Sequence, residues 1–284
     1  MEQIMRRTAD TGFTVTSKAH TPELAVAPGA PGPLEIDSAT IKFGDVTALT
    51  GVSLSVPAGQ FVSIVGPSGC GKTTLLNYAA GLLPTEVLTE GAITVFGEQP
   101  REGRPELAYM LARDSLLPWR TALGNAEFGA EARGVGKEAR RKKARQLLAR
   151  VGLGAFENAY PKALSHGMRQ RVALARTFCL GADLMLMDEP FGALDAQTKM
   201  QLEELLLELW QESGSTVIFI THDLSEAIAL GDRVIVMAPR PGRIVADVPI
   251  DLPRPRHITA LQTDPDYHKL YAHIWSSMEK AFAS

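Results

Sequence analysis

A glycine-rich stretch from Gly66 to Thr73 constrains the fold of this chain more than any other feature of its sequence. It reads GPSGCGKT and fits the phosphate-loop pattern G-x-x-x-x-G-K-[ST]. The apolar run Phe61–Val65 before it predicts a buried strand, and residues 72–80 after it predict a helix that ends at Gly81. A chance match in a glycine-rich loop is the alternative reading. A strand and a helix in these two places weigh against it.

The loop predicts a nucleotide site with distinct roles for its residues. Glycines let successive backbone N–H groups approach phosphate oxygens where a Cβ would be in the way. Lys72 supplies a point charge for the β- and γ-phosphates, and the Thr73 hydroxyl is a ligand for Mg²⁺. Cys70 occupies a variable position of the pattern and is interpreted as a small filler. The expected nucleotide-binding residues are Gly66, Pro67, Ser68, Gly69, Cys70, Gly71, Lys72, Thr73 and Thr74.

The totals limit the class of protein. A length of 284 residues suits one large or two small domains, and 45% hydrophobic with 21% charged residues is typical of a soluble globular protein. A net charge of −3 gives no overall basic field for nucleic acid. No apolar run is long enough to cross a bilayer, so work at a membrane would require a partner. Two cysteines provide no disulfide framework, and the N-terminus has no apolar signal segment, so we expect a cytoplasmic protein.

The first part of the chain predicts a leader followed by strands. Residues 1–33 end in a Pro- and Gly-rich run, which is typical of a flexible linker. Alternating residues predict strands over Leu34–Phe43 and Val52–Val56, joined by a turn near Gly44. Further strand candidates are Ala92–Phe96 and Leu107–Leu111.

Residues 112–181 have a helical pattern. Within them, the segment 137–151 carries a run of Arg and Lys residues, which either binds nucleic acid or forms a solvated helix face. No aromatic residues interleave these charges, so the solvated face is favoured.

After Gly181 strands and helices alternate. Leu184–Met187 is a continuous apolar run, typical of a strand covered on both faces, and residues 216–220 and 233–237 predict two more strands. Apolar residues at helical spacing between residues 202 and 210 predict a helix that ends near Gly214. This alternation implies an α/β core with a parallel sheet. Residues 267–282 predict a C-terminal helix.

Two adjacent acids follow the apolar run. Asp188 stands at the end of the predicted buried strand, where a carboxylate would hold Mg²⁺ beside a phosphate loop. Glu189, next to it, is placed to orient or deprotonate an attacking water. A solvated turn is the alternative, but so apolar a strand is not expected to end at an ordinary surface loop.

Together these features resemble the ATP-binding subunits of ABC transporters. The motifs that carry the resemblance are GPSGCGKTT (66–74), LSHGMRQRVALAR (164–176), LMLMDEPFGALDA (184–196) and THD (221–223), and it covers residues 34–256. The segments Leu116–Arg120, Pro241–Arg243 and Leu252–Pro255 are similar to the taurine, aliphatic sulfonate and nitrate importer branch.

The resemblance implies an α/β fold of the P-loop NTPase (RecA-like) class. Its core would hold a parallel sheet, with an N-terminal antiparallel β subdomain and an inserted α-helical subdomain. The expected division is a leader at 1–33, the ATP-binding domain at 34–260 with its helical subdomain at about 112–181, and a C-terminal helical extension at 261–284.

The resemblance also implies a head-to-tail dimer that holds two ATP molecules between its subunits. Lys72, Glu189 and His222 would be catalytic, Thr73 and Asp188 would hold Mg²⁺, and His222 would contact the γ-phosphate and the attacking water. Ser165, His166 and Gly167 would close on the ATP of the other subunit, as helix starts favour anions, and Asp195 would link the two sites. Phe43 would stack on adenine, with a core position as the alternative.

Two residues depart from the family pattern. Ala112 stands where the family has a Gln that touches Mg²⁺ and the attacking water, and alanine has no group for either task. His166 replaces the first Gly of the usual Ser-Gly-Gly. If that position needs φ > 0 or a close backbone approach, His166 is costly; otherwise its imidazole can donate a hydrogen bond toward phosphate. We expect hydrolysis to survive but to be slowed or coupled differently.

The leading hypothesis is an ATPase subunit that powers import of a small anion. Its expected partners are a second, identical ATP-binding subunit, membrane permease subunits and a substrate-binding protein, with no nucleic acid. It would work at the cytoplasmic face of the cell membrane, attached through the permease. One alternative is a degenerate or regulatory nucleotide-binding subunit with weak hydrolysis. The other is an ABC ATPase outside transport, disfavoured because the chain has a single cassette and no long coiled-coil insertion.

Overall fold

The computed structural model describes residues 32–283. The expected flexible leader of residues 1–33 therefore falls, except for its last two residues, outside the described part of the chain.

A small antiparallel sheet opens the described chain. It contains β1 (Leu34–Phe43), β2 (Val46–Val56) and β4 (Leu88–Val95) in the order β2-β1-β4. The predicted strands are present, and β2 begins six residues before the predicted Val52 because Val46 pairs with Phe43 directly across the turn. A short 3-10 helix, η1 (Thr85–Val87), leads into β4.

The second sheet forms the core of the molecule. Its order is β5-β6-β7-β3-β8-β9. The first five strands in this order are mutually parallel, and every residue of β3, β6 and β7 is buried, as their apolar runs predicted. The strands are β3 (Phe61–Val65), β5 (Leu107–Met110), β6 (Leu184–Asp188), β7 (Thr216–Thr221), β8 (Arg233–Ala238) and β9 (Arg243–Pro249).

The edge strand β9 adds one antiparallel strand to the predicted parallel sheet. It runs antiparallel to β8 as the second arm of a hairpin. Its residues are mostly half-buried, so it lacks the apolar run that marked the central strands. This mixed pattern is typical of an edge strand, where one side of the backbone has no neighbouring strand.

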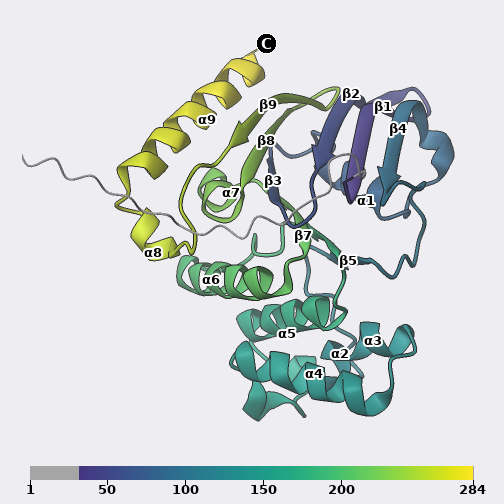
Figure 1. Ribbon diagram of the computed structural model, residues 1–284, viewed down its shortest axis with the longest axis vertical. Coiled ribbons are helices and arrows are strands. Elements are labelled where there is room, and N and C mark those ends of the chain that lie inside the picture. Colours follow the sequence, from purple (N-terminus) through teal and green to yellow (C-terminus); the bar gives the residue numbers. More distant parts are fainter. Residues whose placement is uncertain (1–31, 284) are drawn as a thin grey trace, which may run out of the picture.

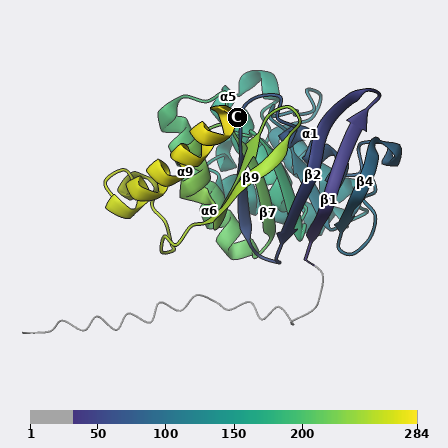
Figure 2. The same ribbon diagram turned by 90° about the horizontal axis from the view of Figure 1, so that it is seen from above.

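Helices and the small sheet cover opposite faces of the core sheet (Figures 1 and 2). Val62 and Ile64 of β3 pack with α1 (Lys72–Ala79) and the antiparallel sheet, whereas Phe61 and Val65 pack with the helices of the other face. This alternation follows from the two-residue period of a strand. The other face is covered by α6 (Ala196–Ser213), α7 (Leu224–Leu230) and α9 (Pro265–Ala283), with the short α8 (Ile258–Leu261) between α7 and α9 along the chain.

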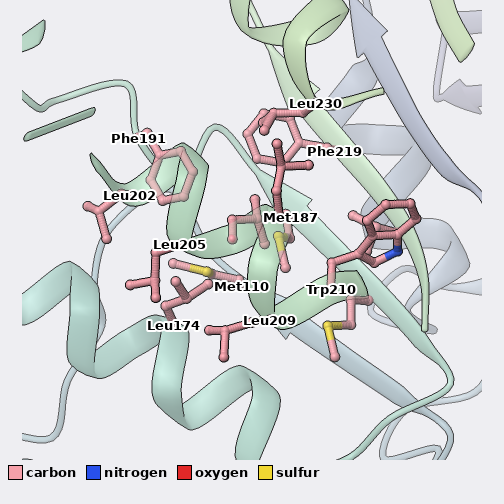
Figure 3. Close-up of a cluster of buried hydrophobic side chains, with 14 of the residues drawn as sticks. Met110, Leu174, Met187, Phe191, Leu202, Leu205, Leu209, Trp210, Phe219 and Leu230 are labelled. Atoms are coloured by element: carbon pink, nitrogen blue, oxygen red, sulfur yellow. The ribbon is translucent and has the colours of Figure 1, made fainter. Parts of the chain in front are cut away.

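The larger hydrophobic cluster joins the core sheet to these helices (Figure 3). Phe219 of β7 lies against Phe61, with ring centroids 5.8 Å apart, and Phe61 meets Trp210 of α6 edge to face at 5.4 Å. Such geometries suit aromatic quadrupoles and fix α6 on the sheet. The helix ends at Gly214, which has the left-handed conformation that favours glycine, as predicted.

The helical segment lies between β5 and β6, at one end of the molecule (Figure 1). It contains α2 (Ala122–Ala126), α3 (Phe128–Ala132), α4 (Lys137–Arg150) and α5 (His166–Cys179), with 3-10 turns η2 (Gly154–Phe156) and η3 (Pro161–Ala163). Three of the basic residues of α4 form ion pairs inside this segment: Arg140 and Arg141 with Glu127, and Arg145 with Glu157. These pairs account for part of its basic run.

None of the helices in the described part of the chain is long and apolar enough to cross a bilayer. The longest, α9, alternates buried and exposed residues from Pro265 to Lys280 and packs on α7, β8 and β9.

Candidate nucleotide-binding site

Strand register brings the motifs of distant segments to one edge of the core sheet. β3 pairs with β7 so that Val65 lies opposite Thr221, and β6 pairs with β7 so that Asp188 lies opposite Ile220. The phosphate loop after β3, Glu189 after β6 and His222 after β7 therefore start at the same level. Carboxyl ends of parallel strands are where ligands bind in open α/β sheets.

The phosphate loop is held by buried contacts. Lys72 is only 5% exposed, and its Nζ donates to the carbonyl oxygens of Gly66 at 2.8 Å and Pro67 at 3.2 Å. Gly71 has φ of +93° and precedes α1, and a Cβ there would lie 2.4 Å from Leu49 Cδ2. Only glycine fits both demands. Thr74 continues the first turn of α1, while Ser68 and Gly69 are exposed at the tip of the loop.

The two predicted Mg²⁺ ligands lie together. Thr73 Oγ1 donates to Asp188 Oδ1 at 3.2 Å, and Asp188 is 8% exposed. Burial raises the pKa of Asp188, and the Thr73 hydrogen bond opposes that rise. Oxygen donors of this kind fit Mg²⁺, which takes one or two protein ligands and completes its shell with phosphate and water. Residues 32–283 hold no cluster of three or more His, Cys, Asp or Glu side chains that would serve as a complete metal cage.

Glu189, the residue after Asp188, and His222 lie side by side at the same sheet edge as Thr73 and Asp188. His222 Nδ1 lies 3.1 Å from Glu189 Oε2, and the two side chains are 56% and 32% exposed. Glu189 has φ of +46°, and its backbone N–H donates to the Ile220 carbonyl at 2.9 Å. A left-handed conformation is strained for a non-glycine residue and is concentrated at functional sites. The sequence carried no sign of this strain.

A buried charged cluster lies behind His222, and the sequence analysis missed it. Lys199 of α6 contacts Asp223 at 2.7 Å, Glu226 at 3.7 Å and Glu203 at 4.0 Å, and Glu226 also accepts a hydrogen bond from Thr221. Burial raises the pKa values of Glu203 and Glu226 to about 7, although Lys199 opposes the rise. The only signal in the sequence was the i,i+4 spacing of Lys199 and Glu203.

The residues expected to act on the ATP of a second subunit lie at the starts of α5 and α6. Ser165 caps α5 by accepting from the Met168 N–H at 3.2 Å, and Asp195 caps α6 by accepting from the Thr198 N–H at 3.0 Å. Figure 1 shows α1, which follows the phosphate loop, beside the antiparallel sheet, and α5 in the helical segment toward the other end of the molecule. Their assignment to a partner's ATP stays a prediction.

His166 is the first residue of α5, exposed, and has no positive φ. Its replacement of glycine therefore carries no left-handed strain, and the hydrogen bond from its imidazole to phosphate stays a prediction. Gly167 does need to be small, because a Cβ there would lie 2.8 Å from the Thr198 methyl of α6.

Phe43 is 42% exposed at the end of β1 and belongs to neither hydrophobic cluster. The core alternative is therefore wrong, and stacking on adenine stays a prediction.

Ala112 is exposed two residues after β5. Met110 lies opposite Met187, so continuation of this register would set Ala112 level with Glu189. The loop is fixed to α5 by residues that the sequence analysis missed. Arg169 contacts Asp114 at 2.7 Å, and Arg176 donates to the carbonyl oxygens of Ser115 and Asp114 at 2.9 Å.

The segment Leu252–Pro255 leads into a clamp on the end of α7. Arg256 Nη1 donates to three carbonyl oxygens there, at 2.6 Å for Gly231 and 3.2 Å for Ile228 and Ala229. Arg254 donates to Leu230 O at 2.6 Å and lies over the Trp210 ring at 4.4 Å. Burial lowers the pKa of Arg256 to about 9. These contacts fix the helix that follows His222.

Comparison with known proteins identifies the class. The family model described as ABC transporter matches residues 49–192. The chain therefore belongs to the ABC transporter family. A dimeric ATP-binding cassette solved in a post-hydrolysis state with ADP and Pi is similar over 77% of this chain and 99% of its own, with a TM-score of 0.66 and 31% identity. The chain is an ATP-binding subunit and an ATPase of the ABC type.

Two relatives narrow the comparison. An uncharacterized ABC transporter ATP-binding protein of Methanocaldococcus jannaschii is 46% identical over 217 residues, which is 76% of this chain and 80% of the relative. The taurine import ATP-binding protein TauB of Rhizobium johnstonii is 44% identical over 226 residues, which is 78% of this chain and 85% of the relative. This identity confirms that the chain is similar in sequence to ATP-binding subunits of the taurine branch.

Proposed function

We propose that this chain is the ATP-hydrolysing subunit of an importer for a small anion of the taurine, sulfonate or nitrate type. The observation that carries the proposal is the 44% identity to a taurine import ATP-binding protein over most of both chains. The segments Leu116–Arg120, Pro241–Arg243 and Leu252–Pro255 support it, since they resemble the same branch.

In the proposed reaction, each side chain at the sheet edge has a separate task. Lys72 Nζ would exchange the carbonyl oxygens of Gly66 and Pro67 for phosphate oxygens of ATP. Glu189 would accept a proton from the attacking water, and His222 would hold that water and the γ-phosphate. Thr73 and Asp188 would hold Mg²⁺, which neutralises phosphate charge when bound.

The site would be completed by a second copy of the chain. The exposed starts of α5 and α6 carry Ser165, His166, Gly167 and Asp195, which would face the partner's nucleotide in a head-to-tail dimer. Backbone N–H groups at a helix start favour an anion, which suits the γ-phosphate. The dimeric assembly of the similar post-hydrolysis cassette supports this arrangement.

The subunit would sit at the cytoplasmic face of the cell membrane, attached through permease subunits that receive substrate from a binding protein. Trp119 is 71% exposed in the loop that Arg169 and Arg176 hold on α5, and it would be part of the permease contact. Burying an aromatic side chain is a common source of interface energy.

Reconstitution tests this function. The chain would be co-purified with the permease subunits of its transporter and placed in vesicles with the binding protein. We expect ATPase stimulation by taurine, an alkanesulfonate or nitrate, and none by a neutral sugar or a cationic amino acid. Stimulation only by a sugar or a cation would contradict the anion assignment, and failure of Trp119→Ala alone to weaken co-purification would contradict the permease contact.

Ala112 favours a second candidate, a nucleotide-binding subunit with weak hydrolysis and a regulatory role. Single-turnover hydrolysis, with Glu189→Gln as the inactive control, separates the two. Turnover no faster than the control would favour the regulatory role, whereas clearly faster turnover would favour the transport ATPase.

A further inference from the structure

The turn between β8 and β9, residues 239–242, lies directly against the phosphate loop. A Cβ at Gly242 would be 2.0 Å from the carbonyl oxygen of Cys70 and 2.8 Å from Leu49 Cδ2. In the same way, a Cβ at Gly66 would be 2.5 Å from the carbonyl oxygen of Met237 at the end of β8. Two glycines, one on each side, thus allow the hairpin and the phosphate loop to touch backbone to backbone.

Hydrogen bonds attach the same turn to the antiparallel sheet. The Thr50 N–H donates to Gly242 O and the Gly242 N–H donates to Ala48 O, both at 2.9 Å. Figure 1 shows the β8–β9 hairpin reaching β2. The phosphate loop is therefore held between β2, which meets it at Gly71, and the turn, which meets it at Cys70.

A cavity of about 630 Å³ opens beside this junction. Gly69 of the phosphate loop and Arg240 with Pro241 of the turn form part of its wall, and β2 supplies Val46 to Ala48. The lining also includes Lys42, the residue before Phe43, and Val46, which pairs with Phe43 across the turn, so the cavity lies next to the end of β1 that carries this aromatic. Its volume lies within the range of about 300–1,000 Å³ that is typical of small-molecule sites.

The charges in the cavity suit an anionic ligand. Lys42 and Arg240 contribute two cations to the lining and Glu90 contributes one acid, which accepts a hydrogen bond from Thr40. Arg240 is exposed, and its φ of +53° is a left-handed conformation that non-glycine residues rarely adopt. The guanidinium offers a planar set of donors that matches phosphate oxygens.

We propose that Arg240 is a further ATP-binding residue that contacts the α-phosphate and ribose of the bound nucleotide. A nucleotide whose phosphates lie on the phosphate loop and whose base lies on Phe43 would run from Gly69 toward the end of β1, and Gly69, Lys42 and Val46 all line this cavity. Gly242 sets the position of Arg240 by fixing the turn to the phosphate loop and to β2. The inference rests on ATP binding alone and is independent of the transported substrate.

Isothermal titration of the purified full chain with ATP and with ADP tests the proposal. Arg240→Ala is expected to weaken both nucleotides about tenfold, because both carry the α-phosphate and ribose and a hydrogen bond to a charged group is worth roughly 1.5 kcal/mol or more. Arg240→Lys should recover part of the loss. Arg101→Ala, which removes the same charge from an exposed loop before β5, should leave both affinities within about twofold.

Each other outcome overturns the assignment. A loss for ATP but not ADP would place Arg240 at the γ-phosphate, equal losses for Arg240→Ala and Arg101→Ala would reduce it to a general charge effect, and unchanged affinities would remove it from the site. Since Arg240 is exposed, its substitution should not prevent folding, which thermal unfolding would verify. The titration contains no permease and no transported substrate, so the importer proposal can fail without affecting its result.

Discussion

The phosphate loop and the exposed region formed by the loop after β5 and the start of α5 differ in how they are packed. The phosphate loop is enclosed at its base by neighbouring backbone at Gly66 and Gly242 and by the Leu49 side chain at Gly71, and no side chain larger than hydrogen fits at these glycines. The loop after β5 and the start of α5 are exposed, and side chains such as Arg169 and Arg176 connect them. The enclosed region leaves little freedom for change, whereas the exposed region tolerates replacement. Both departures from the family pattern, Ala112 and His166, fall in the exposed region.

This contrast implies that the affinity for ATP and the rate of its hydrolysis can be changed separately. A substitution in the enclosed region should lower nucleotide affinity. A substitution at the hydrolytic side chains or in the exposed region should change turnover while affinity is kept.

Glu189→Gln provides the largest expected effect. It removes the proposed proton acceptor but keeps the shape of a side chain 3.1 Å from His222, so turnover should fall by about 10²–10⁴-fold with ATP affinity unchanged. Steady-state phosphate release and isothermal titration measure the two quantities. Glu102→Gln, at an exposed acid before β5, is the matched control and should keep full turnover. A parallel loss of affinity would mean that Glu189 acts in binding.

Ala112→Gln should raise turnover, in contrast to Glu189→Gln. A Gln level with Glu189 would supply the missing polar group near Asp188, and one positioning group at such a site is worth about 10- to 1000-fold in turnover. ATPase of the purified transporter, with and without transported substrate, measures the gain. Leu111→Gln adds the same amide one residue earlier on an exposed side chain and should have no such effect. Unchanged turnover and unchanged stimulation by substrate for Ala112→Gln would contradict the hypothesis.

The sequence alone was sufficient for the enclosed region because its constraints are local. Gly66 to Thr73 must form one loop, and the apolar runs before it and before Asp188 can only be central strands of a covered sheet. The antiparallel edge strand β9 was missed since its half-buried residues resemble no single pattern. The clamp by Arg254 and Arg256 was missed because its partners are backbone carbonyls more than 20 residues away in sequence, which no spacing rule reveals.

The cluster behind His222 leads to a pH-dependent prediction. The pKa values of Glu203 and Glu226 rise from 4.5 to about 7 on folding because burial favours the protonated carboxyl. A raised pKa means that folding takes up protons, so this contribution to stability is complete below pH 4.5 and is lost as pH rises through 7. Urea unfolding should show a decline on the order of 2 kcal/mol for each of the two carboxyls between pH 5 and pH 8.

Glu226→Gln keeps an acceptor for Thr221 but does not titrate, so its decline over the same range should be smaller. Glu212→Gln, at an acid of α6 that pairs with Arg150 on the surface, should retain the slope of the unmodified chain. Identical slopes for all three proteins would show that the cluster does not take up the proton.

His166→Ala has the smallest expected effect and tests the exposed region directly. His166 is the first residue of α5 and has no left-handed strain, so its removal should not change the free energy of unfolding measurably. If the imidazole donates to the partner's ATP, its loss costs about 1 kcal/mol at each of the two ATP sites, so the ATP-dependent dimer should be about 30-fold weaker. Sedimentation of the Glu189→Gln background, in which ATP persists, would measure this equilibrium. His166→Asn keeps a donor and should lose less than His166→Phe, whereas equal behaviour of the two would mean that position 166 contributes only shape.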